Sequence, residues 1–190
     1  MSKLNINPRM GVLVLFILFF AMIRVWVPMS PGLDFLANFT VVGALALFAG
    51  AYVKSGVKSF ALPIGALLLS DIVLSQTVYK TDGFLYEGWY YTYIAFALMV
   101  LVGKVMLRKV NVGNVVLSTL VIVFIHWIVT DFGVWYKSPM YPQTLYGYWM
   151  CLVNAIPFER AFLTSTLLYS AVMFGSFEFV KAKFPSLKLA

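Results

Sequence analysis

The sequence is poor in the residue types that metal sites and soluble enzymes use. Its 190 residues include one cysteine and one histidine, and only 11% are charged. One cysteine excludes a disulfide within the chain, and no CxxC, HxxxH or HExxH spacing provides zinc ligands. Walker A and GxSxG sequences, typical of phosphate-binding loops and serine hydrolases, are also missing. We therefore expect a protein that is not an enzyme and that has no metal centre and no cofactor.

Apolar residues dominate the composition instead. Hydrophobic residues make up 62% of the chain and the mean hydropathy is +0.91, whereas soluble domains have roughly 45–50% apolar residues. This composition predicts one integral membrane domain over residues 1–190. The net charge of +7 would favour nucleic acid binding in a soluble protein. Here the basic residues follow the expected membrane orientation, so we expect the lipid bilayer and no nucleic acid as a partner.

Six segments are long and apolar enough to cross a bilayer, which takes about 20 residues. They are residues 10–28, 36–53, 58–79, 89–107, 113–135 and 161–181. The predicted fold is therefore an all-α bundle of six transmembrane helices. Residues 142–160 are too apolar for a free loop and too short to cross the bilayer comfortably. We predict that they form an extra helical hairpin or interfacial segment on the outer face, between the fifth and sixth helices.

The basic residues predict the orientation of these helices. Ten of the 14 lysines and arginines fall at one end of the expected bundle: Lys3, Arg9, Lys54, Lys58, Lys104, Arg108, Lys109, Lys181, Lys183 and Lys188. Membrane proteins carry an excess of Lys and Arg in their cytoplasmic loops. We therefore expect a multi-pass protein with both termini in the cytoplasm.

Ionisable residues inside an expected helix call for an explanation, because a charged side chain there is costly without a partner. Asp71, His126 and Asp131 all fall in the outer half of the predicted membrane region. Their common depth favours a shared ligand cavity. The alternative is that they are interhelical contacts, with His126 donating to a neighbouring helix and Asp131 paired with Arg24 or Arg160.

Aromatic residues gather on the same predicted outer side, beyond what an interfacial belt on both faces would give. Some of these rings therefore favour a pocket for a flat or amphipathic ligand. Cys151 is either a packed, inert thiol or a ligand contact. With the three polar residues above, the predicted ligand contacts are Asn38, Asp71, Trp89, His126, Asp131, Trp135, Tyr146, Cys151 and Asn154.

Small residues form a stripe along the second expected helix. Gly43, Ala46 and Gly50 are spaced at i, i+3 and i+7, which lets another helix approach closely. The stripe either packs inside the protein or is a docking face for another membrane subunit.

Four stretches carry a resemblance to a known family: "NFTVVGALALFAGAYV", "ALPIGALLLSDIVLS", "FGVWYKSPMYPQTLYGYWMCLVNAIPF" and "LLYSAVMFG". With them the chain resembles the substrate-binding S components of energy-coupling factor (ECF) vitamin transporters of bacteria. The resemblance implies a six-helix bundle in the bacterial inner (cytoplasmic) membrane, with an outer pocket closed by residues 28–36, 80–88 and 136–160. It also implies a coupling protein and two ATPases as partners. S components dock through small residues in the first helix, whereas here the stripe lies in the second.

The resulting expectation is a substrate-binding subunit for uptake of a vitamin or related small cofactor precursor. Cys151 keeps a cobalamin-type ligand possible, because in some relatives of S components a cysteine contacts the cobalt. Two alternatives remain: a structural or accessory subunit of a larger membrane complex, and a membrane enzyme that uses Asp71, His126 and Asp131 for proton transfer.

Overall fold

A computed structural model describes residues 8–30, 39–54, 56–80, 82–184 and 187. These residues form six helices and no strand: α1 (Pro8–Met29), α2 (Val42–Tyr52), α3 (Gly56–Thr77), α4 (Trp89–Met106), α5 (Val112–Trp135) and α6 (Leu145–Lys183). All except α2 are long and apolar enough to cross a membrane. The prediction of an all-α fold with helices long and apolar enough to cross a membrane is therefore confirmed for the described residues, and the lengths of two predicted segments are wrong.

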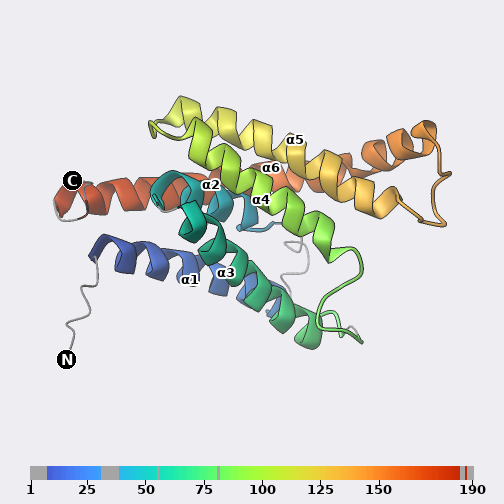
Figure 1. The fold of residues 1–190 in the computed structure, drawn as a ribbon, viewed down its shortest axis with the longest axis horizontal. Helices are drawn as coiled ribbons and strands as arrows, with labels where there is room; N and C mark the ends of the chain where they lie inside the picture. The colour runs from blue at the N-terminus through green and yellow to red at the C-terminus, as the bar shows by residue number, and fades with distance from the viewer. Residues whose placement is uncertain (1–7, 31–38, 55, 81, 185–186, 188–190) are drawn as a thin grey trace.

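Consecutive helices run in opposite directions, so α1 begins and α6 ends at the same end of the bundle (Figure 1). We call this end, where α1, α3 and α5 begin and α2, α4 and α6 end, the basic end. It carries eight basic residues of the described chain: Arg9, Lys54, Lys58, Lys104, Arg108, Lys109, Lys181 and Lys183. The basic residues that predicted a cytoplasmic side thus gather at one end of the fold.

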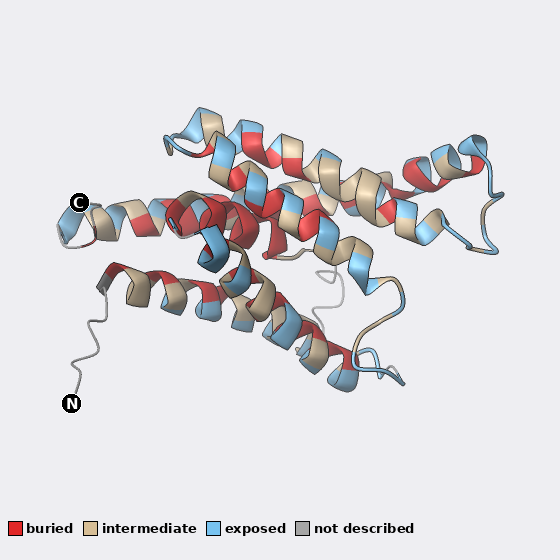
Figure 2. Cartoon of the chain, viewed as in Figure 1, coloured by how far each residue is buried: buried red, intermediate tan, exposed pale blue. Residues whose placement is uncertain are grey.

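The short helix α2 forms the centre of the bundle. Its 11 residues extend about 16 Å at 1.5 Å per residue, roughly half the hydrocarbon thickness of a bilayer. Ten of them are buried, and Figure 2 shows this helix almost wholly in the buried class. A helix that is apolar all round is stable only when other helices surround it. The predicted span over residues 36–53 is therefore wrong in length, because within the described residues the helix begins at Val42.

The small residues of α2 pack inside the protein. A Cβ atom on Gly50 would lie 2.3 Å from the carbonyl oxygen of Val100 in α4, and one on Gly103 would lie 2.7 Å from the carbonyl oxygen of Leu47. The backbones of α2 and α4 therefore touch through their glycines. Gly43 faces Thr166 and Phe162 of α6 in the same way.

The interpretation of Gly43, Ala46 and Gly50 as a docking face is corrected by this packing. All three are buried among the other helices. A partner subunit cannot reach them without separating α2 from its neighbours. Small side chains at a helix contact look alike in sequence whether the second helix belongs to the same chain or to another.

The last helix is longer than predicted. Residues 145–183 form one helix of 39 residues, which replaces the expected separate segment over residues 142–160 and the helix over 161–181. Pro157 lies inside it. Prolines are tolerated within membrane helices because neighbouring groups satisfy the freed backbone, and they bend the helix. Figure 1 shows this bend between the orange and red parts of α6.

The orientation can be tested by cysteine labelling at the two ends. Phe84 follows α3 and is 80% exposed, whereas Val112 begins α5 at the basic end and is 81% exposed. We expect a membrane-impermeant maleimide to label Phe84→Cys in intact cells and Val112→Cys only after permeabilisation. The single native cysteine, Cys151, is buried and gives little background. The opposite labelling pattern would reverse the predicted orientation.

Candidate functional site

A cavity of about 190 Å³ lies between the helices, on the side of α2 away from the basic end. All six helices contribute to its wall. Most of the lining is apolar, and five aromatic rings belong to it: Phe39, Tyr79, Phe158, Phe162 and Tyr169. Three lining residues have ionisable side chains of the kind that bind ligands or ions: Arg24, His126 and Glu159.

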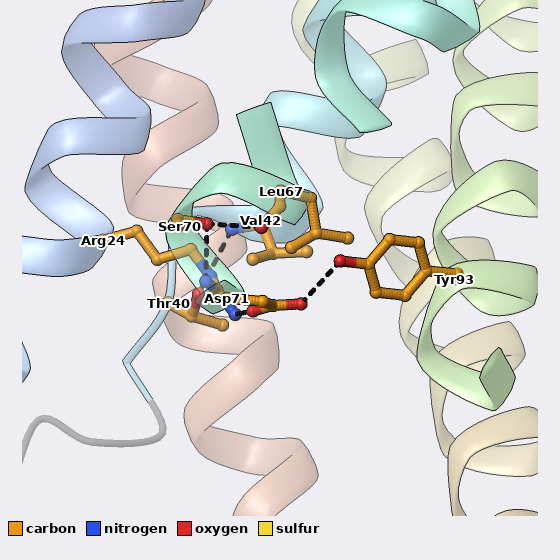
Figure 3. Close-up of polar contacts among 7 residues, drawn as sticks. All are labelled: Arg24, Thr40, Val42, Leu67, Ser70, Asp71 and Tyr93. Carbon is orange, nitrogen blue, oxygen red and sulfur yellow. Dashed lines mark hydrogen bonds and ion pairs between the residues drawn. The ribbon is translucent and has the colours of Figure 1, made fainter. Parts of the chain in front are cut away.

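Arg24 of α1 is held by a polar network on α3 and α4 (Figure 3). Its Nη2 lies 2.5 Å from Oδ1 of Asp71, and its Nη1 donates to Oγ of Ser70 at 2.7 Å. The hydroxyl of Tyr93 donates to the other carboxylate oxygen of Asp71 at 3.0 Å. The Asp71 side chain is only 2% exposed. Both oxygens of this buried carboxylate are therefore satisfied, and the charge of Arg24 is balanced before any ligand enters.

His126 and Glu159 form a second polar contact at the wall of the cavity. Nδ1 of His126 in α5 lies 2.7 Å from Oε1 of Glu159 in α6. The imidazole also stacks on Phe162, with 4.2 Å between ring centroids. These two contacts fix the orientation of the imidazole and join α5 to α6.

The second oxygen of the Glu159 carboxylate, Oε2, is buried and accepts no hydrogen bond from any described residue. Leaving such an acceptor unsatisfied costs about 1–3 kcal/mol, and more when the group is charged. Because Glu159 lines the cavity, a hydrogen-bond donor inside the cavity would remove this cost. Glu159 Oε2 is thus a buried acceptor without a described partner, on a residue that lines the site.

Tyr86 lies in the loop between α3 and α4, next to this region. Burial, the largest effect, raises the pKa of its hydroxyl above the ordinary value, and a hydrogen bond with Thr92 lowers it by less. The hydroxyl therefore stays protonated at neutral pH. Thr92 itself lines the cavity, so the Tyr86 loop supports one wall of the site.

Of the predicted ligand contacts, His126 lines the cavity. Asp71 does not line the cavity, but it forms an ion pair with Arg24, which does. Asn38 lies outside the described residues. The predicted convergence of Asp71, His126 and Asp131 on one cavity is therefore corrected to Arg24, His126 and Glu159.

The remaining predicted contacts do not line this cavity. Asp131 is buried beside Cys151, whose Sγ donates to the Asp131 carbonyl oxygen at 3.6 Å. The indole of Trp135 donates to the carbonyl oxygen of Pro142 at 2.8 Å, and so ties the end of α5 to the following loop. Trp89, Tyr146 and Asn154 are exposed. The alternative pairing of Asp131 with Arg24 is also wrong, because Arg24 pairs with Asp71.

Sequence reasoning missed Arg24 and Glu159 as site residues. Arg24 was considered only as a partner for Asp131, and Glu159 falls in the predicted outer segment over residues 142–160, where a charge needs no explanation. One signal was available for Glu159. If residues 145–183 are taken as one helix, Glu159 becomes a carboxylate within an apolar helix, which by default marks a functional site. Pro157 hid this signal, because a proline usually ends a helix.

Within the described residues, no group of three or more His, Cys, Asp or Glu side chains could hold a metal ion. The site therefore offers an ion pair, an open carboxylate oxygen and aromatic surface. This combination is suited to binding a small organic molecule.

The chain belongs to the DUF6580 family, a family of unknown function, which matches residues 4–187. No curated protein and no solved structure matches the chain.

Proposed function

We propose that this member of the DUF6580 family binds a small amphipathic molecule in its central cavity, as a substrate-binding membrane protein. The observation that carries the proposal is Glu159 Oε2, a buried acceptor without a partner at the wall of a cavity. A buried polar atom of this kind is costly unless something meets it. A bound ligand with a hydrogen-bond donor supplies the missing contact.

The size of the cavity limits the ligand. Its volume of about 190 Å³ is below the roughly 300–1,000 Å³ of pockets for drug-sized ligands. A ligand of one or two small rings matches this volume. A cobalamin-type ligand does not fit it, and the buried Cys151 lies outside the cavity wall.

The wall also favours one end of the ligand over the other. The charge of Arg24 is balanced by Asp71, and Nδ1 of His126 contacts only one oxygen of the Glu159 carboxylate. The polar atom left for a ligand is therefore the second oxygen, Oε2. Aromatic rings such as Phe162 and Phe158 also line the cavity, and ring faces attract cations. An organic amine or a protonated nitrogen heterocycle meets both features. Several vitamins and cofactor precursors belong to this chemical class.

The proposed role is capture of such a nutrient for uptake across the bacterial inner membrane, with the termini in the cytoplasm. A resemblance to S components supports a coupling protein and ATPases as partners. Docking would then use the outer faces of the long helices, since the stripe on α2 is buried. We propose no catalytic role, because Asp71, His126 and Asp131 do not meet in one cavity.

The proposal is tested by Glu159→Gln. Glutamine keeps an oxygen toward His126 and replaces the carboxylate charge, so the fold should survive. We expect the variant to bind the molecule retained by the wild-type protein with an affinity roughly 5- to 150-fold lower. This corresponds to about 1–3 kcal/mol for a lost buried polar contact. The measurement is mass spectrometry of molecules released on denaturation, followed by binding titration with the molecule found.

Glu87→Gln is the matched control, because Glu87 lies in an exposed loop and does not line the cavity. It should retain the wild-type amount of ligand. If the wild-type protein releases no small molecule, or if Glu159→Gln binds it as well as the wild type, the proposed function is wrong. A structural subunit would give the first of these results, together with co-purified partner chains.

A further inference from the structure

A second cavity, of about 360 Å³, lies at the basic end of the bundle, away from the proposed ligand site. Its charged lining consists of Arg9 from α1, Arg108 from the loop after α4, and Glu178 and Lys181 from α6. Tyr52 and Leu107 form an apolar floor and are 5% and 1% exposed. Three positive side chains and one negative side chain therefore surround one concave space.

The contacts within the cavity show how these charges are balanced. The Tyr52 hydroxyl donates to Oε1 of Glu178 at 2.5 Å, and Lys181 binds the same carboxylate. The Glu178 charge is therefore matched by Lys181. Nη2 of Arg9 donates to the carbonyl oxygen of Tyr52 at 3.3 Å. Tyr52 is the last residue of α2, and a helix C-terminus carries about half a negative charge.

Arg108 adds a charge that the protein does not match. Its side chain is exposed at the rim and forms no ion pair with a described residue. Arg9, Arg108 and Lys181 thus outnumber the one carboxylate at the cavity, that of Glu178. A phosphodiester carries about one negative charge and a phosphate monoester up to about two. The unmatched charge of Arg108 can therefore be balanced by one phosphate group.

We propose that this cavity binds a phosphate group, with Arg108 and Arg9 as the principal cationic contacts. Arginine suits this role because its planar guanidinium donates two parallel hydrogen bonds to phosphate oxygens. These basic residues line a cavity. The other basic residues at this end are explained by the general excess of Lys and Arg in cytoplasmic loops. Basic pockets between helices at the cytoplasmic side are also where anionic lipid head groups bind.

The source of the phosphate is either the head group of an anionic lipid or free phosphate in solution. Both present the same oxygens to the arginines. They differ in whether acyl chains hold the group at the membrane surface, so competition by inorganic phosphate separates them. The proposal does not depend on a ligand in the central cavity.

The test compares Arg108→Gln with Lys109→Gln in the full chain. The two residues are neighbours, both are basic and exposed, and only Arg108 lines the cavity. The protein is purified in neutral detergent and mixed with phosphatidylglycerol and phosphatidylcholine in equal amounts, and native mass spectrometry measures the lipids retained. We expect the wild type to prefer phosphatidylglycerol, Arg108→Gln to lose about fivefold of this preference and Lys109→Gln to keep it.

A second arm adds millimolar inorganic phosphate. Displacement of phosphatidylglycerol by phosphate would assign the site to a soluble phosphate group, and resistance would assign it to a lipid head group. The proposal is overturned if the wild type has no preference, if Arg108→Gln keeps the preference, or if both variants lose it equally. Equal loss would mean diffuse attraction to the basic end. Unchanged melting temperatures of both variants exclude unfolding as the cause of a loss.

Discussion

Replacing Arg24 with methionine is expected to lower the free energy of unfolding by roughly 3–5 kcal/mol, the usual cost of removing one partner of a buried ion pair. Methionine keeps the apolar stem but leaves the Asp71 carboxylate, 2% exposed, without its cation. Only the hydrogen bond from Tyr93 then remains on this carboxylate. The measurement is chemical or thermal unfolding in detergent.

The double variant Arg24→Met with Asp71→Asn separates the ion pair from simple packing. Once the buried charge is gone, most of the lost stability should return, because no charged group is left uncompensated. Arg160→Gln is the control, because Arg160 is exposed and the hydrogen bond that it accepts from Thr164 goes to its backbone carbonyl oxygen. A double variant as unstable as Arg24→Met would show that the arginine stem, and not the ion pair, holds α1 against α3.

The second large effect is expected at the contact of α2 with α4. In Gly50→Ala, the new Cβ would lie 2.3 Å from the Val100 carbonyl oxygen and 2.8 Å from the Lys104 backbone nitrogen. Because both atoms belong to the backbone, a side-chain rotation cannot relieve the clash and the two helices must move apart. We expect a loss of roughly 3 kcal/mol or more, at the upper end of overpacking effects.

Gly65→Ala is the matched control, since a Cβ at this helical position meets no atom within 4 Å. Alanine is a better helix former than glycine by about 1 kcal/mol, so this variant should be neutral or more stable. Unfolding midpoints in the same detergent compare the two. If Gly50→Ala is as stable as the wild type and instead fails to assemble with a partner, the docking interpretation of the stripe would return.

Local patterns predicted the long helices well. The apolar segments over residues 10–28, 58–79, 89–107 and 113–135 correspond closely to α1, α3, α4 and α5. Long apolar segments form helices in a bilayer because every backbone polar group must be satisfied within the segment. The same reasoning failed at Pro157, where tertiary contacts let one helix continue through a residue that usually ends helices.

Site residues were harder to predict than helices. His126 was found because a lone imidazole in an apolar helix is conspicuous. Its partner Glu159 lies 33 residues further along the chain, and the partner of Arg24 lies in another helix. Spacing within one helix gives the depth and face of a residue but does not say which helix stands opposite. Pairings of this kind depend on how the helices pack.

The sequence by itself determined that the chain forms helices long and apolar enough to cross a membrane and which end of the bundle is basic, because both follow from composition and from residues near each other in the chain. The tertiary structure alone decided that α2 is a buried half-length helix, that its glycines serve internal contacts, and that Arg24 and Glu159 face one cavity. A stripe of small residues, or a single charged residue, is compatible with several ways of packing the helices. Only the positions of the neighbouring helices select one of them, because close packing and ion pairing are properties of two surfaces and not of one.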